Sequence, residues 1–168
     1  TGLDGLVGEA IQAIAEGRFQ MDEQAPLSPA AAATQPDDFG PRMILLGAAG
    51  MLRRAGLGAE ALWADELIAG VLERYHDPET GVLRNTPDGD AFNAGHGIEF
   101  VGFAFDHLGP DPDPALRDRL ARILLASAGR AFRSPGIALS VSLSTGDLLS
   151  PWFPWWPLPE TIRACALA

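Results

Sequence analysis

Residues 93–109, NAGHGIEFVGFAFDHLG, carry the pattern that decides the fold. A polar loop from Asn85 to Gly95 ends in this stretch, and apolar side chains then recur at helical spacing. The pattern predicts a helix over about 96–108 with Gly109 after it. A Pro-Asp loop follows, and the next apolar positions predict a helix over about 114–133. Two helices joined in this way form an antiparallel hairpin.

The same arrangement is predicted upstream. Pro41 suits the first turn of a helix running to about residue 55, and a short Gly loop leads to a helix over about 59–75. A first helix is expected over about 3–16, and a last one from near Pro159 to the end. Residues 20–40 are rich in Pro and Ala and predict a long loop.

The fold class predicted from these elements is all-α. Ile137, Leu139, Val141 and Leu143 alternate with small residues, which predicts one strand, and the turn at 145–147 makes it a small β-hairpin. Helical hairpins with long loops after alternate helices suit an α/α toroid, and they would also suit a helical repeat array. The sequence has no fixed-period repeat, which favours the toroid.

Composition bounds the classes of protein. The 168 residues, 47% of them hydrophobic, suffice for one packed domain or part of a larger one. All 12 basic residues are Arg against 22 acidic ones, a net charge of −10, which argues against nucleic-acid binding. Without Lys, this chain offers no Schiff-base lysine and no P-loop lysine. The single Cys165 cannot form an internal disulfide, and its apolar helical surroundings predict a buried thiol.

Several further functions are not expected. The sequence has no apolar run of about 20 residues and no signal peptide at Thr1, so we expect a cytoplasmic protein without a membrane segment. Zinc-ligand spacing and a dinucleotide fingerprint are missing, and Asp88-Gly89-Asp90 lacks the other ligands of a calcium loop. We therefore expect no metal and no cofactor.

His96 and Glu99 are the first candidates for chemistry. Three residues apart on a helix, they share one face, one turn from each other. A nearby carboxylate can orient an imidazole or raise its pKa, and an imidazole is the usual proton-transfer group near neutral pH. The alternative is structural: His96 caps the helix, and Glu99 bonds a neighbouring loop.

An aromatic stretch, residues 151–157, supplies the next candidates. Trp152, Trp155 and Trp156 lie between prolines, where a regular helix stripe is excluded, and such rings can stack on a sugar. Alternatively they plug the end of the fold or an interface. Glu160 follows at the start of the last helix, where it either complements the helix dipole or contacts a substrate or His96.

Two motifs resemble the N-acylglucosamine 2-epimerase family, which includes cellobiose 2-epimerases and mannose isomerase-like enzymes. Gly95-His96-Gly97-Ile98-Glu99 is similar to that family's Gly-His-x-Ile-Glu motif. Residues 155–160 look like its Trp-Trp-Pro-Gln-Ala-Glu motif. A weaker likeness runs from Pro41 to about Arg84 and includes the turn Asp77–Gly81.

The resemblance implies an (α/α)6 barrel of which this chain covers only the middle, so we expect a piece of a longer protein. It implies that His96 is a proton-transfer base and acid with Glu99 as its partner. Trp155 and Trp156 would wall the sugar site, with Glu160 beside them. The implied reaction is epimerisation or isomerisation of a carbohydrate through an enediol(ate), and the sequence leaves open whether the remaining parts come from a homo-oligomer or the same polypeptide.

The chain departs from the family pattern near Pro41. Arg42 and Ile44 stand where His is common, and Gly47 replaces a usual Glu. Ile44 is expected to face the same cavity as His96. Two other functions therefore stay open: a glycoside-processing hydrolase that uses Glu99 and Glu160, and a non-catalytic diverged carbohydrate-binding protein.

Overall fold

The fold is mostly helical. A computed structural model describes residues 2–16, 18, 28, 30, 37–57 and 63–168. The helices in these ranges are α1 (Leu3–Ala15), α3 (Gly40–Arg54), α4 (Trp63–Arg74), α5 (Ala94–Leu108), α6 (Pro114–Ala131) and α7 (Pro157–Leu167). The predicted helices over 3–16, 41–55 and 114–133 are confirmed within two residues. The predicted start of α4 and most of the predicted 20–40 loop lie outside the described residues.

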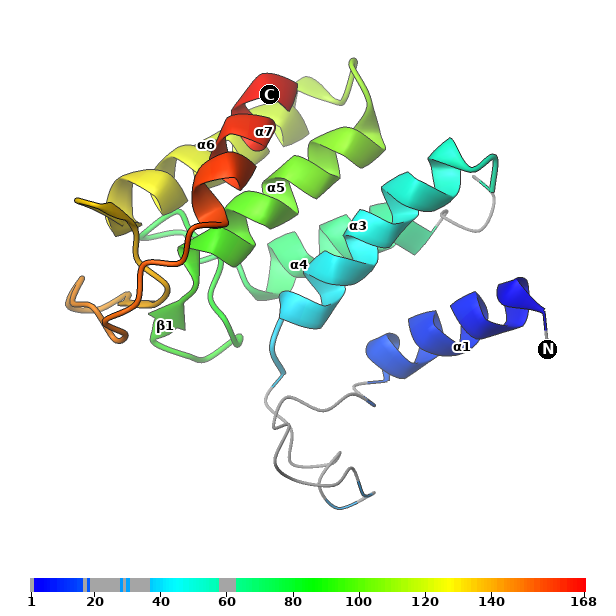
Figure 1. Cartoon of the computed structure of the whole chain (residues 1–168), viewed down its shortest axis with the longest axis horizontal. Coiled ribbons are helices and arrows are strands. Elements are labelled where there is room, and N and C mark those ends of the chain that lie inside the picture. Colours follow the sequence, from blue (N-terminus) through cyan, green and yellow to red (C-terminus); the bar gives the residue numbers. More distant parts are fainter. Residues whose placement is uncertain (1, 17, 19–27, 29, 31–36, 58–62) are drawn as a thin grey trace.

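Helices α3, α5 and α7 run side by side in the same direction (Figure 1). Helices α4 and α6 run the opposite way behind them, so that α3–α4 and α5–α6 are antiparallel hairpins. Helix α5 is central and packs against α3, α6 and α7. The first residues of α3, α5 and α7 therefore lie at one end of the molecule, where the loops and short strands gather (Figure 1).

The core lies between these two layers of helices. Its largest fully buried side chains come from every helix from α3 to α6 and from the loops at the shared end: Phe39, Met43, Leu46, Val71, Tyr75, Leu83, Phe92, Ile98, Phe100, Leu120, Ile123 and Ile137. Burial of each such side chain stabilises the fold by about 1.5–3 kcal/mol. The apolar spacing seen in the sequence thus becomes the inward face of each helix.

Helix α5 begins at Ala94, two residues before the predicted start. The side-chain oxygen of Asn93 accepts a hydrogen bond from the His96 backbone N–H at 3.2 Å, which makes Asn93 the N-cap. His96 therefore lies inside the first turn and is not itself the cap.

The prediction of a single strand over residues 137–144 is wrong. Strand β3 (Gly136–Ile137) pairs with β2 (Phe132–Arg133), whereas β4 (Val141–Ser142) pairs with β1 (Ala91–Phe92). The segment is divided because its two halves find different antiparallel partners. The predicted turn at 145–147 is confirmed, since Val141 forms a bridge with Leu148 across it.

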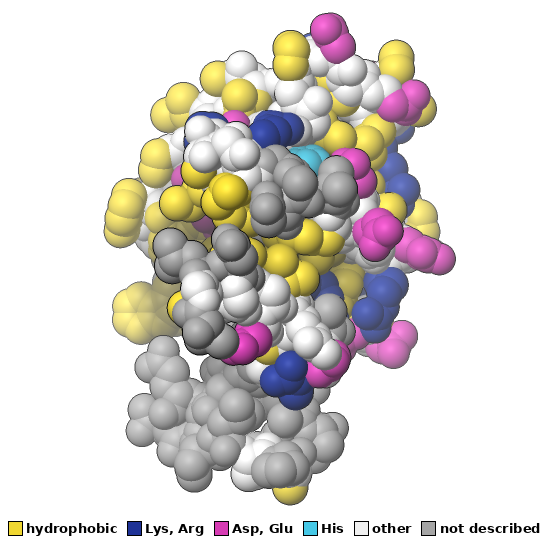
Figure 2. Space-filling model, turned by 90° about the vertical axis from the view of Figure 1, so that its right-hand side faces the viewer, with side chains coloured by type: hydrophobic (Ala, Val, Ile, Leu, Met, Phe, Trp, Pro, Cys, Tyr) yellow, Lys and Arg dark blue, Asp and Glu magenta, His cyan; other side chains and the backbone are white. Residues whose placement is uncertain are grey.

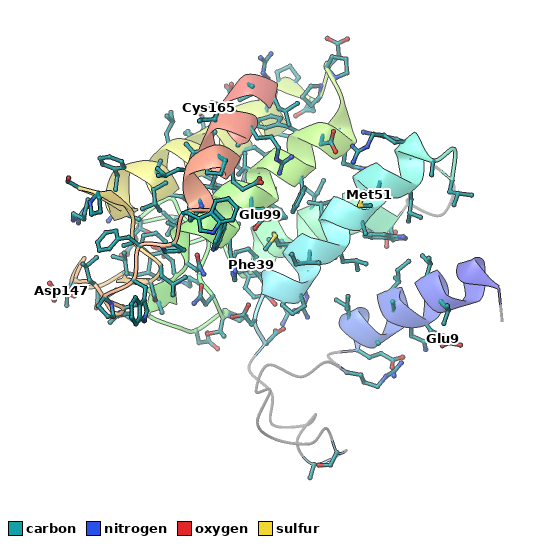
Figure 3. The ribbon with its side chains drawn as sticks, in the orientation of Figure 1. Glu9, Phe39, Met51, Glu99, Asp147 and Cys165 are labelled. Atoms are coloured by element: carbon teal, nitrogen blue, oxygen red, sulfur yellow. The ribbon has the colours of Figure 1, made fainter. Side chains whose placement is uncertain are left out.

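The predicted burial of Cys165 is also wrong, because this residue is exposed. Ala164 faces inward on α7, and the next residue of a helix points about 100° away from it. Figure 3 shows Cys165 far along α7 from the loop-bearing end. Among the described helices, none has both the length and the apolar character needed to cross a membrane.

Candidate functional site

His96 lies among aromatic side chains at the end of the helices where the loops gather. Its ring stacks on Trp156, with centroids 5.8 Å apart and planes at 29°. The Phe39 ring lies nearly perpendicular to the His96 ring, with centroids 6.1 Å apart and planes at 83°. These contacts join the starts of α3, α5 and α7, so the two sequence motifs meet through one imidazole–indole stack.

Burial lowers the pKa of His96, and the nearby carboxylate of Asp38 partly opposes this effect. The Nδ1 atom of His96 is buried and has no hydrogen-bond partner among the described residues. The neutral imidazole is therefore the favoured form near neutral pH, and a neutral imidazole can accept a proton.

Glu99 has different neighbours one turn further along α5. It is half-buried, and burial followed by the charge of Glu160 raises its pKa, while Arg163 opposes this. Arg163 Nε donates to Glu160 Oε2 at 2.8 Å, and its guanidinium lies over the Phe103 ring at 4.6 Å. Figure 3 shows Glu99 on α5 between α7 and α3. Glu99 therefore favours the protonated form more than an ordinary carboxyl does, whereas Glu160 has a cationic partner.

These side chains share one face of two parallel helices, α5 and α7. His96, Glu99 and Phe103 follow each other at helical spacing on α5, and Trp156, Glu160 and Arg163 do so along the start and length of α7. We call these six residues the three-turn face. Their contacts show that the neighbouring stripes of α5 and α7 meet turn by turn.

Helix α3 borders this face with small residues. A methyl group added at Gly40 would lie 3.3 Å from the His96 ring, and one added at Gly47 would lie 2.8 Å from the Phe103 ring. Gly47, which stands where the resembled family has Glu, thus makes room for Phe103. Ile44 lies on the same stripe between the two glycines and is 60% exposed. That Ile44 and His96 face the same cavity stays a prediction.

The tryptophans differ in their surroundings. Trp156 is half-buried against His96, whereas Trp155 is 78% exposed and Trp152 is 68% exposed. Trp155 is therefore next to the stacked indole in the chain but not packed on His96. Its open ring is available to a ligand.

The sequence interpretation missed Asp38 and Phe39. Both precede α3 in a stretch that was assigned to a long loop, and loop residues carry no periodic signal. The signal that could have revealed Asp38 is its position two residues before Gly40, since its Oδ1 accepts the Gly40 N–H at 2.7 Å. Asn93 was also missed, although an Asn before an apolar helix is a common N-cap.

Two apolar grooves lie away from the three-turn face. One of about 380 Å³ separates α1 from α3, and one of about 690 Å³ lies between α6 and α7. Neither is lined by a residue of the three-turn face. Figure 2 shows the side of the molecule that is on the right in Figure 1, where hydrophobic side chains cross the middle and acidic ones follow an edge.

Within the ranges that the structure describes, no three His, Cys, Asp or Glu side chains gather closely enough to hold a metal ion. No protein-family model matches the chain, and no curated protein is significantly similar to it.

Proposed function

We propose that this chain is part of a sugar epimerase or aldose–ketose isomerase built on an α/α toroid. The toroid is supported by the parallel order of α3, α5 and α7, with α4 and α6 behind them. The observation that carries the function is the half-buried His96 ring stacked on Trp156 at 5.8 Å, because it joins a proton-transfer group to an aromatic surface.

In the proposed reaction the carbohydrate binds in its ring-opened form. Neutral His96 removes the proton from the carbon next to the carbonyl, and the electron pair moves to give an enediol(ate). Return of a proton to the other face gives the epimer, whereas return to the neighbouring carbon gives the isomer. Glu99 is the acid that the described residues offer for this step, since its raised pKa keeps more of it protonated.

The aromatic and charged groups divide the binding of the sugar. Trp156, with the exposed Trp155 beside it, would contact the C–H faces of the sugar. Glu160 and Arg163 would hydrogen-bond its hydroxyl groups.

The test is hydrogen exchange from substrate into solvent. The chain is incubated in D2O with a panel of aldoses and ketoses, and NMR follows deuterium uptake at the carbon next to the carbonyl. We expect uptake with the unaltered chain and none with His96→Asn. His107→Asn, on the same helix at its other end, is the matched control and should retain uptake. Circular dichroism checks that both variants fold, because His96 also packs between Trp156 and Phe39.

A second function is favoured by the unequal environments of Glu99 and Glu160. A carboxyl with a raised pKa beside an Arg-paired carboxylate is the pattern of the acid and the ionised partner in glycoside hydrolysis. Release of reducing sugar from a glycoside, lost in Glu160→Gln and kept in His96→Asn, would establish this function in place of the isomerase.

A further inference from the structure

The carboxylate whose charge acts on His96 belongs to Asp38, which lies two residues before the start of α3. A methyl group built at Gly40 would lie 2.9 Å from Asp38 Oδ1 and 3.4 Å from His96 Nδ1. The two atoms are therefore at most about 6.3 Å apart, the sum of these distances. Glycine at position 40 leaves the space between them free of a side chain.

Asp38 is held in this place by the surrounding backbone. Its Oδ1 accepts the Gly40 N–H at 2.7 Å, and its carbonyl accepts a hydrogen bond from Arg42 at 2.9 Å. The neighbouring Phe39 is fully buried, and its N–H donates to the Asn85 carbonyl at 3.1 Å. The carboxylate thus has a defined position relative to the imidazole before any ligand binds.

The other charged groups on the packed elements are engaged elsewhere. Asp37 pairs with Arg42 and Arg74 and accepts from the Tyr75 hydroxyl. Glu99 interacts electrostatically with Glu160 and Arg163 of α7. The charge of Asp38, in contrast, raises the pKa of His96 and so opposes the effect of burial.

We propose that Asp38, and not Glu99, is the positioning residue of His96: its carboxylate favours the proton on the buried Nδ1 and so leaves Nε2 as the basic nitrogen. The inference rests on the proposed function for its catalytic meaning, but its geometry is independent of any substrate. Asp38 forms no hydrogen bond with Nδ1, so it acts through its charge. A negative charge near Nδ1 favours the tautomer with the proton on that nitrogen, and it stabilises the imidazolium that forms when Nε2 takes a proton.

The test is an NMR titration of the imidazole groups in the whole 168-residue chain. The sequence has three His, and comparison with His96→Asn assigns the His96 signals. In Asp38→Asn the pKa of His96 should fall, because the negative charge that favours the imidazolium is gone. The ring ¹⁵N shifts should also show loss of the Nδ1–H preference.

Glu99→Gln is the matched control, since it removes one carboxylate charge on His96's own helix. We expect it to leave the pKa and the tautomer of His96 as they are. Asp38→Ser is the second variant, because its hydroxyl can still accept the Gly40 N–H while the charge is lost. It should shift His96 in the same direction as Asp38→Asn.

The proposal is overturned if both Asp38 variants leave the titration and the ¹⁵N shifts of His96 unchanged, or if Glu99→Gln shifts them more. Should one Asp38 variant fail to fold, the other decides. A substrate identified by deuterium uptake adds a second reading: loss of Asp38's charge should slow uptake about 10-fold or more at neutral pH, because the imidazolium then lacks a stabilising charge. Absence of uptake in the unaltered chain would refute the proposed function and leave the titration result standing.

Discussion

His96 and Glu99 show how one helical turn changes the environment of a side chain. Both lie on the same stripe of α5, yet His96 meets aromatic rings whereas Glu99 meets a carboxylate and a guanidinium. Burial is the largest influence on each pKa, and it favours the neutral form of both groups. A neutral base and an acid with a raised pKa are what a proton-transfer site needs.

At the residue scale, Glu99→Gln should stabilise the fold near pH 7 by no more than about 1 kcal/mol. The folded-state pKa of Glu99 is raised above 4.5, so the folded state binds its proton more tightly than the unfolded state does. The stability that this proton supplies is present below about pH 4.5 and is lost as the pH rises through the folded-state pKa. Urea unfolding at pH 7 and pH 4 measures the difference, which should disappear at the lower pH.

Glu73→Gln is the control for this prediction, because Glu73 is an exposed residue of a helix. Its unfolding free energy should change by less than about 0.5 kcal/mol at either pH. A Glu99→Gln variant that is less stable than the unaltered chain at pH 7 would show that the ionised carboxylate stabilises the fold.

At the scale of elements, glycines set how closely α5 and α7 approach. A methyl group on Gly95 would lie 2.3 Å from the Trp156 ring, and one on Gly102 would lie 2.8 Å from Arg163. Real Cβ atoms do not come this close, so both positions need the hydrogen that glycine provides. Helix α5 carries the imidazole, and its glycines allow α7 to bring the indole onto it.

Gly95→Ala should therefore destabilise the protein by about 1–3 kcal/mol and displace the indole from His96. Near-ultraviolet circular dichroism and urea unfolding measure the two effects. The control is Gly129→Ala on α6, where an added methyl group meets no atom within 4 Å and should stabilise the helix by about 0.5–1 kcal/mol. Equal effects of the two substitutions would mean that the close approach of α7 to α5 does not matter.

At the scale of the whole molecule, the excess of acidic residues opposes compaction. The sequence has 12 Arg against 22 Asp and Glu, and some of these Arg form ion pairs or hydrogen bonds at helix ends. Arg54 pairs with Asp106 at 2.6 Å, while Arg53 donates to the last carbonyls of α5 at Asp106 and His107. These contacts join the ends of α3 and α5 but leave the net charge at −10.

Raising NaCl from about 0.01 M to 0.3 M should therefore increase the melting temperature at pH 7, because salt screens the repulsion between acidic groups. Differential scanning calorimetry at several salt concentrations measures the change. A melting temperature that falls with salt would show that the ion pairs outweigh the repulsion.

The sequence alone was sufficient for the helices and for their order. Apolar spacing in α3, α5 and α6 follows the 3.6-residue period. Pro41 lies in the first turn of α3, and Gly109 directly follows the last residue of α5, the positions at which proline and glycine are favoured. It also named His96 and Trp156, whose stacking in the structure comes from residues 60 positions apart in the chain. Local periodicity supplied the first result, and the two motifs of the resembled family supplied the second.

Tertiary structure alone decided which groups surround the imidazole. The spacing of His96 and Glu99 on one helix suggested a pair, but helix packing turned Glu99 toward Glu160 and Arg163 of α7 and brought Asp38 to His96. It likewise divided residues 137–144 between two partners and left Cys165 exposed. Spacing along a chain reports which residues share a face of one helix, whereas the neighbours across that face depend on how closely the helices approach.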